Sequence, residues 1–224
     1  MSPPSPKLAV FDCDGTLIDS QRNIIRAMAN SFQRHNLPPP DDHSTRSIVG
    51  LSLVEAMQSL LPEADPGLHI SLAHDYKTAF QRLRAQKQLD PEPMYDGMAA
   101  LLAALNDAGW LLAVATGKSD RGLAMALAHH NIGHHFISLQ TADRHPSKPH
   151  PAMLEAARAE AGADASSTYI IGDTVFDILM GQHAGVRAIG VDWGYHAAED
   201  LMDAGALGVA ADSAHLWSLL HAPA

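Results

Sequence analysis

The feature that most limits the fold of this chain is an alternation of short apolar runs with helical patterns after residue 95. Apolar runs with the length of buried strands recur at residues 110–115, 136–139, 168–171 and 187–191. Helical patterns lie between them at residues 98–108, 121–130, 151–160 and 176–184. This alternation predicts a parallel sheet with helices on both faces.

One further strand is expected near the start of the chain, at residues 7–12, and only helical patterns follow it up to about residue 88. These patterns predict helices from residue 20 onward, at residues 53–61 and at residues 69–84. The chain therefore reads as an α/β core, residues 1–18 and 92–224, with an all-helical cap domain, residues 19–91, inserted after the first strand. Hinges are expected at the two crossings, near residues 17–20 and 89–93.

Composition and charge limit the partners. The formal net charge is −10, from 15 Lys and Arg against 25 Asp and Glu, which argues against nucleic acid or an anionic membrane. No apolar run is long enough to span a bilayer. The single cysteine, Cys13, cannot form an internal disulfide, and the N-terminal residues MSPPSPK lack an apolar signal core, so a cytoplasmic location is expected.

Polar side chains stand where the predicted strands end. In open parallel sheets these ends share one edge, which is where ligands bind. The candidates are Asp12 and Asp14 after the first strand, Thr116 and Gly117 after the second, Lys148 before the helix at 151–160, and Asp173 with Asp177 after the strand at 168–171.

Up to four carboxylates would meet at this edge with one hydroxyl and one ammonium group. Carboxylates so close together require a cation or shared protons. Because the ligands are all oxygens, a hard ion such as Mg²⁺ is favoured. Mg²⁺ together with Lys148 would let an anion approach, so the residues predict a metal-assisted site for a phosphate ester.

Four segments, in order, resemble the motifs of the haloacid dehalogenase superfamily: FDCDGT, ATGKS, SKPHP and IGDTVFDI. The position of the helical insert is similar to the phosphoglycolate-phosphatase-like group, whose cap lies between the first two motifs. The resemblance implies a three-layer Rossmann-like core with a cap. It also implies a Mg²⁺-dependent phosphatase that acts on a small phosphorylated metabolite. A monomer or homodimer is expected, and the sequence does not choose between them.

The resemblance assigns roles to the candidates. Asp12 would be the nucleophile that forms an aspartyl-phosphate, and Asp14 the general acid and base. Residues i and i+2 of a strand face the same side, so both can face one phosphate while Cys13 packs behind the strand. Thr116 and the Gly117 amide would bind phosphate oxygens.

Mg²⁺ would be held by the Asp12 carboxylate, the Asp14 backbone carbonyl and Asp173. Lys148 would neutralise charge on the nucleophile and the transferring phosphoryl group. Asp177 would orient Lys148 or a water on the metal.

Other activities of the superfamily fit less well. A dehalogenase needs no acid at Asp14. A phosphonatase carries a cap lysine, and a phosphohexomutase typically an arginine after the glycine equivalent to Gly50, whereas residues 49–53 read VGLSL. The alternatives kept open are phosphohexomutase-like phosphoryl transfer and a non-catalytic binding module. The substrate is left open among phosphoglycolate, sugar phosphates, nucleoside monophosphates and pyrophosphate.

One residue of the second motif departs from the family pattern. Many relatives have Asn where this chain has Gly117, which removes a side-chain contact and leaves the substrate less defined. In the cap, Arg46, Gly50 and Lys77 are candidates for substrate contact, and Gly50 would lie in the loop that closes over the site. Asp19 is expected to cap the first helix of the insert.

Overall fold

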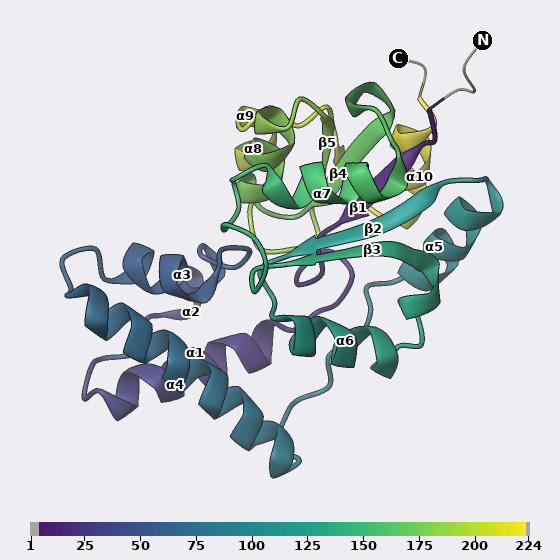
Figure 1. Ribbon diagram of the computed structural model, residues 1–224. Helices are drawn as coiled ribbons and strands as arrows, with labels where there is room; N and C mark the ends of the chain where they lie inside the picture. Colours follow the sequence, from purple (N-terminus) through teal and green to yellow (C-terminus); the bar gives the residue numbers. More distant parts are fainter. Residues whose placement is uncertain (1–4, 223–224) are drawn as a thin grey trace.

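The computed structural model describes residues 5–222 of the chain (Figure 1). Residues 1–4 of the N-terminal segment MSPPSPK lie outside the described residues. The strands are β1 (Leu8–Phe11), β2 (Leu111–Thr116), β3 (Phe136–Thr141), β4 (Thr168–Gly172), β5 (Arg187–Val191) and β6 (Val209–Ala210). The helices are α1 (Gln21–Arg34), α2 (Asp42–Arg46), α3 (Leu53–Leu60), α4 (Pro66–Ala85), α5 (Met98–Asp107), α6 (Asp120–His129), α7 (Ala152–Ala161), α8 (Val175–His183), α9 (Ala198–Asp203) and α10 (Ser213–Leu220), with short 3₁₀ turns at Gly133–His135 and Ala165–Ser167.

The six strands form one sheet in the order β3-β2-β1-β4-β5-β6, and all neighbouring pairs are parallel. β1 therefore lies in the centre, between β2 and β4. The pairing continues one residue past β1, where the Asp12 N–H donates to the Ile171 carbonyl at 2.9 Å. The predicted α/β fold with a parallel sheet is confirmed, and the first strand ends in the middle of the sheet edge.

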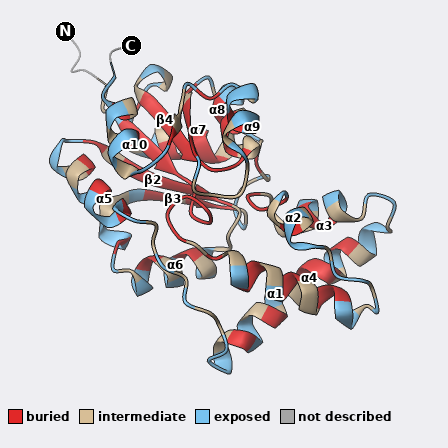
Figure 2. Cartoon of the chain, turned by 180° about the vertical axis from the view of Figure 1, so that it is seen from behind, coloured by how far each residue is buried: buried red, intermediate tan, exposed pale blue. Residues whose placement is uncertain are grey.

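Side-chain alternation along the strands produces the three layers. Ala9 and Phe11 face a core that is covered by α5, α6 and α10. Leu8 and Val10 face a second core, covered by α7, α8 and α9. Because β1 is buried on both faces, its sequence LAVF is continuously apolar, as is usual for central parallel strands. Figure 2 shows the buried strands of the sheet between the helices.

Helices α1 to α4 pack on one another away from the sheet (Figure 1). Their apolar faces meet in a separate small core that includes Met28, Phe32, Met57 and Leu72. This arrangement agrees with an inserted helical cap, while its boundaries at residues 18/19 and 91/92 stay a prediction.

The two chain crossings between cap and sheet run side by side. The Asp19 N–H donates to the Pro93 carbonyl at 2.9 Å, and the Tyr95 N–H donates to the Leu17 carbonyl at 3.1 Å. The cap is therefore attached close to the carboxyl end of β1. Among the described residues, no helix has both the length and the apolar character needed to cross a bilayer.

Candidate active site

The predicted site residues do meet at one edge of the sheet. Asp12 directly follows β1, Thr116 ends β2, Asp173 follows β4 and Asp177 lies in the first turn of α8. Lys148 comes from the segment before α7. Each of these five side chains is at most 1% exposed. Parallel strands place their carboxyl ends together, which is why segments more than 150 residues apart in the chain supply one cluster.

Lys148 lies between two carboxylates. Its Nζ is 2.8 Å from Asp12 Oδ1 and 2.6 Å from Asp177 Oδ1. Although burial disfavours the ammonium charge, Asp12 and Asp177 hold the pKa of Lys148 above its ordinary value. The other Asp177 oxygen accepts from the Thr174 hydroxyl at 2.8 Å and from the Thr174 N–H, which closes a capping box at the start of α8. Both oxygens of Asp177 are thus committed to positioning Lys148 and the helix.

The Asp12 carboxylate is buried but poorly satisfied. Its Oδ2 has no hydrogen-bond partner among the described residues, and the one partner of its Oδ1 is the Lys148 ammonium at 2.8 Å. Burial, opposed by Lys148 and reinforced by Asp177, raises the pKa of Asp12 to about 7. Buried polar atoms normally find partners, so these oxygens are placed to meet a ligand or a metal.

Asp173 is held rigidly. Its Oδ1 accepts from the Thr16 hydroxyl at 2.8 Å, and its Oδ2 accepts from the Tyr195 N–H at 3.0 Å. Gly15, at φ +86°, packs directly on this carboxylate, and a Cβ there would lie 2.1 Å from Asp173 Oδ2. The glycine after the two aspartates therefore allows Asp173 to approach β1. Burial, reinforced by Asp12, raises the pKa of Asp173 well above its ordinary value.

Asp14 has different partners from Asp12. Its Oδ1 accepts from the Ser20 hydroxyl and lies 2.7 Å from Lys118 Nζ. Lys118 was given no role from sequence, although it stands in the second motif. The sequence does place a lysine two residues after Thr116. Its contact with Asp14, however, depends on the path of the turn after β2.

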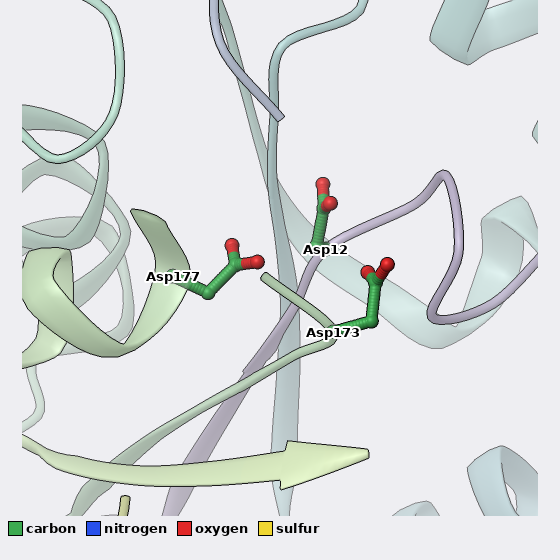
Figure 3. Close-up of side chains that lie close together, drawn as sticks. All are labelled: Asp12, Asp173 and Asp177. Atoms are coloured by element: carbon green, nitrogen blue, oxygen red, sulfur yellow. The ribbon is translucent and has the colours of Figure 1, made fainter. Parts of the chain in front are cut away.

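The donor set fits a divalent cation. Oxygen atoms of Asp12, Asp173 and Asp177 lie within 4.8 Å of one another (Figure 3). With all four carboxylates at the site ionised, counting Asp14, and with two ammonium groups, Lys118 and Lys148, the net charge is −2. One divalent ion balances that charge, and oxygen donors suit a hard ion. Asp177 is paired with the Lys148 ammonium through Oδ1 and caps α8 through Oδ2, whereas Asp173 accepts only from neutral donors and Oδ2 of Asp12 has no partner, so Asp12 and Asp173 are the better ligands.

A cavity of about 1250 Å³ separates this edge from the cap. Asp12, Asp14 and Thr116 line it from the sheet, and Gly50 and Lys77 line it from the cap. Arg46 ends α2 and does not line it.

Gly117 meets the cap directly. A Cβ at this position would lie 2.6 Å from the Leu51 carbonyl oxygen and 2.9 Å from that of Gly50. The next cap residue is also tied down, because the Ser52 N–H donates to the Ser147 hydroxyl, beside Lys148, at 2.7 Å. Glycine in the second motif therefore lets the cap backbone rest on the site.

Two smaller expectations concern the ends of the first motif. Cys13 is buried in the core on the α5 side of the sheet, as predicted. Asp19 lies just before α1, and its carboxylate accepts from the Gln21 N–H at 3.2 Å, while Ser20 occupies the N-cap position itself.

Comparison with known proteins identifies the family. Residues 9–191 match the family model described as haloacid dehalogenase-like hydrolase. The chain belongs to this family, and the assignment made from its four motifs is confirmed.

Individual relatives agree with this assignment. The probable phosphatase IndB of Dickeya dadantii is 34% identical over 196 residues, which cover 87% of this chain and 84% of the relative. A phosphoglycolate phosphatase of Vibrio cholerae is 28% identical over 208 residues, covering 89% and 90%. The crystal structure of a hydrolase from Pseudomonas syringae is similar with a TM-score of 0.84 and 25% identity, over 96% of this chain and 97% of that one.

Proposed function

We propose that the protein is a Mg²⁺-dependent phosphatase that hydrolyses a small phosphate monoester through an aspartyl-phosphate on Asp12. The observation that carries the proposal is the Asp12 carboxylate, which lines the cavity with Oδ2 free of hydrogen bonds and with the Lys148 ammonium at Oδ1. The phosphatase names of its relatives support the reaction class.

In the first step Asp12 attacks phosphorus, and the bond from phosphorus to the ester oxygen breaks. Asp14 gives its proton to the departing alcohol. Lys118 and Ser20 both contact Oδ1 of Asp14, and no hydrogen bond or ion pair of the described residues involves Oδ2, which leaves that oxygen for the leaving group. The phosphoryl oxygens lie against the Thr116 hydroxyl and the Gly117 amide, and Lys148 stabilises their charge.

In the second step a water molecule attacks phosphorus of the aspartyl-phosphate, Asp14 takes its proton, and inorganic phosphate leaves. This restores Asp12 as a carboxylate. Mg²⁺, held by the carboxylates of Asp12 and Asp173 and the Asp14 carbonyl, would supply positive charge opposite the phosphoryl oxygens. Thr16 and the Tyr195 N–H keep Asp173 oriented for that role.

We place this reaction in the cytosol, on a small phosphorylated substrate. The one cysteine is buried behind β1 and has no second cysteine with which to pair, which suits a reducing compartment.

The deciding experiment is phosphate release from p-nitrophenyl phosphate with Mg²⁺, comparing the wild-type protein with Asp12→Asn. We expect turnover to fall at least about 10³-fold, because the nucleophile is lost. Rapid acid quenching should trap covalent phosphate on the wild-type chain only. Asp203→Asn, an exposed aspartate at the end of α9, is the matched control and should leave turnover unchanged.

Wild-type turnover in a folded Asp12→Asn protein would contradict the proposal. Isomerisation of a sugar phosphate without phosphate release would instead indicate a mutase. Binding of phosphate without any turnover would indicate a non-catalytic module.

A further inference from the structure

The cavity above the carboxylates is far larger than a two-carbon acid phosphate requires. Its volume, about 1250 Å³, exceeds the range of roughly 300–1000 Å³ that pockets for drug-sized ligands span. The phosphate end of a substrate is confined to the part lined by Asp12 and Thr116. The remaining space therefore belongs to the organic part of the ester.

The cap side of this space is lined mainly by apolar side chains. They come from α1, the segment before α3, α3 itself and α4, and include Ile24, Met28, Ile48, Val54, Tyr76 and Phe80. Tyr76 and Phe80 lie one helical turn apart on α4, and their ring centroids are 6.0 Å apart. Tyr76 lines the same cavity as Asp14 and Lys118, and burial raises the pKa of its hydroxyl.

Phe80 is the more telling of the two rings. Tyr76 packs against the cap core, whereas Phe80 is half-buried and belongs to none of the apolar cores formed by the described residues. Its ring contacts Tyr76 and the Arg84 guanidinium and otherwise borders the cavity. The fold therefore gains little from an aromatic side chain here, whereas a bound apolar group would gain a large contact surface.

The charges beside the catalytic carboxylates suit an apolar leaving group better than an acidic one. A second anionic group close to the phosphate, as in phosphoglycolate, needs a nearby cation. The two lysines that reach the motif carboxylates are already paired, Lys148 with Asp12 and Asp177 and Lys118 with Asp14. Neither is available to a carboxylate of the substrate without breaking a pair that the reaction uses. The cavity is also lined by Lys77, which pairs with Asp143 at 3.7 Å, by Arg84, which lies over the Phe80 ring, and by Arg121, which is exposed to solvent.

We infer that the preferred substrate is the phosphate monoester of an alcohol that bears a ring-sized apolar group, which packs against Tyr76 and Phe80. This inference rests on the phosphatase activity proposed above and narrows its substrate class. A two-carbon acid phosphate is then a poor substrate.

The test compares kcat/KM for three esters of primary alcohols, so that the leaving groups are chemically similar: ethyl phosphate, 2-phenylethyl phosphate and phosphoglycolate, all with Mg²⁺. We expect 2-phenylethyl phosphate to exceed ethyl phosphate by about 10- to 100-fold, as burial of a phenyl group predicts. It should also exceed phosphoglycolate. This comparison uses the wild-type protein and does not depend on any variant folding.

Substitution then tests the ring. Phe80→Ala should reduce the ratio of 2-phenylethyl to ethyl phosphate by about 5- to 10-fold, and Phe80→Leu should retain most of it. Leu207→Ala removes an apolar side chain that is 64% exposed and outside the cavity. It should change kcat/KM for neither 2-phenylethyl phosphate nor ethyl phosphate.

The possible failures are distinguishable. If phosphoglycolate is hydrolysed as well as or better than 2-phenylethyl phosphate, or if Phe80→Ala leaves the ratio intact, the substrate class is wrong while the phosphatase activity stands. If none of these esters nor p-nitrophenyl phosphate releases phosphate, the proposed function fails and the substrate inference fails with it.

Discussion

Lys118 Nζ lies 2.7 Å from Oδ1 of Asp14, the carboxylate proposed to move the proton. The two side chains are 15% and 12% exposed, so their attraction is only weakly screened by water. Ser20 donates to the same oxygen. The pair fixes one edge of the Asp14 carboxylate and turns the other edge toward the cavity.

Lys118→Met should therefore impair catalysis more than binding. Without the ammonium, Asp14 loses the contact that holds its orientation, and we expect kcat to fall about 10- to 100-fold with a smaller change in KM. Steady-state kinetics with p-nitrophenyl phosphate measure both values. Lys118→Arg keeps the charge and should recover part of the loss. An unchanged kcat in Lys118→Met would show that Ser20 alone orients Asp14.

The main outline of this site follows from sequence because each strand end carries a polar segment and parallel strands bring those ends together. Asp12, Thr116 and Asp173 could be predicted as site residues from their positions at the ends of apolar runs alone. The Lys118 contact could not be found in this way, since it depends on the path of the turn after β2.

Elements were missed where the local pattern is weak. Helix α2, sequence DHSTR, has no apolar periodicity, and its start is set by Asp41, whose carboxylate accepts from the Ser44 N–H at 2.7 Å. Strand β6 is two residues long and exists because β5 offers a free edge. Such pieces are stabilised by tertiary contacts that no short window of sequence contains.

Gly117→Ala tests the contact between the second motif and the cap. The added Cβ would lie 2.6 Å from the Leu51 carbonyl oxygen, a backbone atom that cannot rotate away, so the cap must shift. We expect kcat/KM to fall about 10-fold or more, because small displacements of substrate-positioning groups are costly. Gly133→Ala is the matched control, since its Cβ would meet nothing closer than 3.7 Å, and kinetics of the two variants are compared directly. Equal kinetics would mean that the cap is not seated on Gly117 during turnover.

Lys148→Met should damage both stability and activity. The substitution keeps an apolar stem of similar length but leaves Asp12 and Asp177 without their shared cation in a fully buried place. Breaking a buried pair on one side costs about 3–5 kcal/mol, which thermal or denaturant unfolding would detect. Turnover should fall at least about 100-fold, because the charge opposite the phosphoryl group is lost. A variant as stable as the wild type would contradict the ion pairs described for Lys148.

As pH rises, the stability of the metal-free protein should fall, whereas the stabilisation by Mg²⁺ should grow. The folded pKa of Asp12 is about 7, above its ordinary value of 3.8, so between these pH values the folded protein binds more protons than the unfolded chain. Without metal, the free energy of unfolding therefore falls as pH rises from about 4 to about 7. Mg²⁺ competes with those protons for Asp12, so its stabilising effect should grow over the same range. Melting temperatures measured with EDTA and with millimolar MgCl₂, at about pH 5 and about pH 8, give both trends.

The Asp12→Asn variant should reduce both the pH dependence in EDTA and the stabilisation by Mg²⁺, whereas the exposed Asp203→Asn should leave both unchanged. A Mg²⁺ effect that is equal at the two pH values would show that the ion does not bind through Asp12.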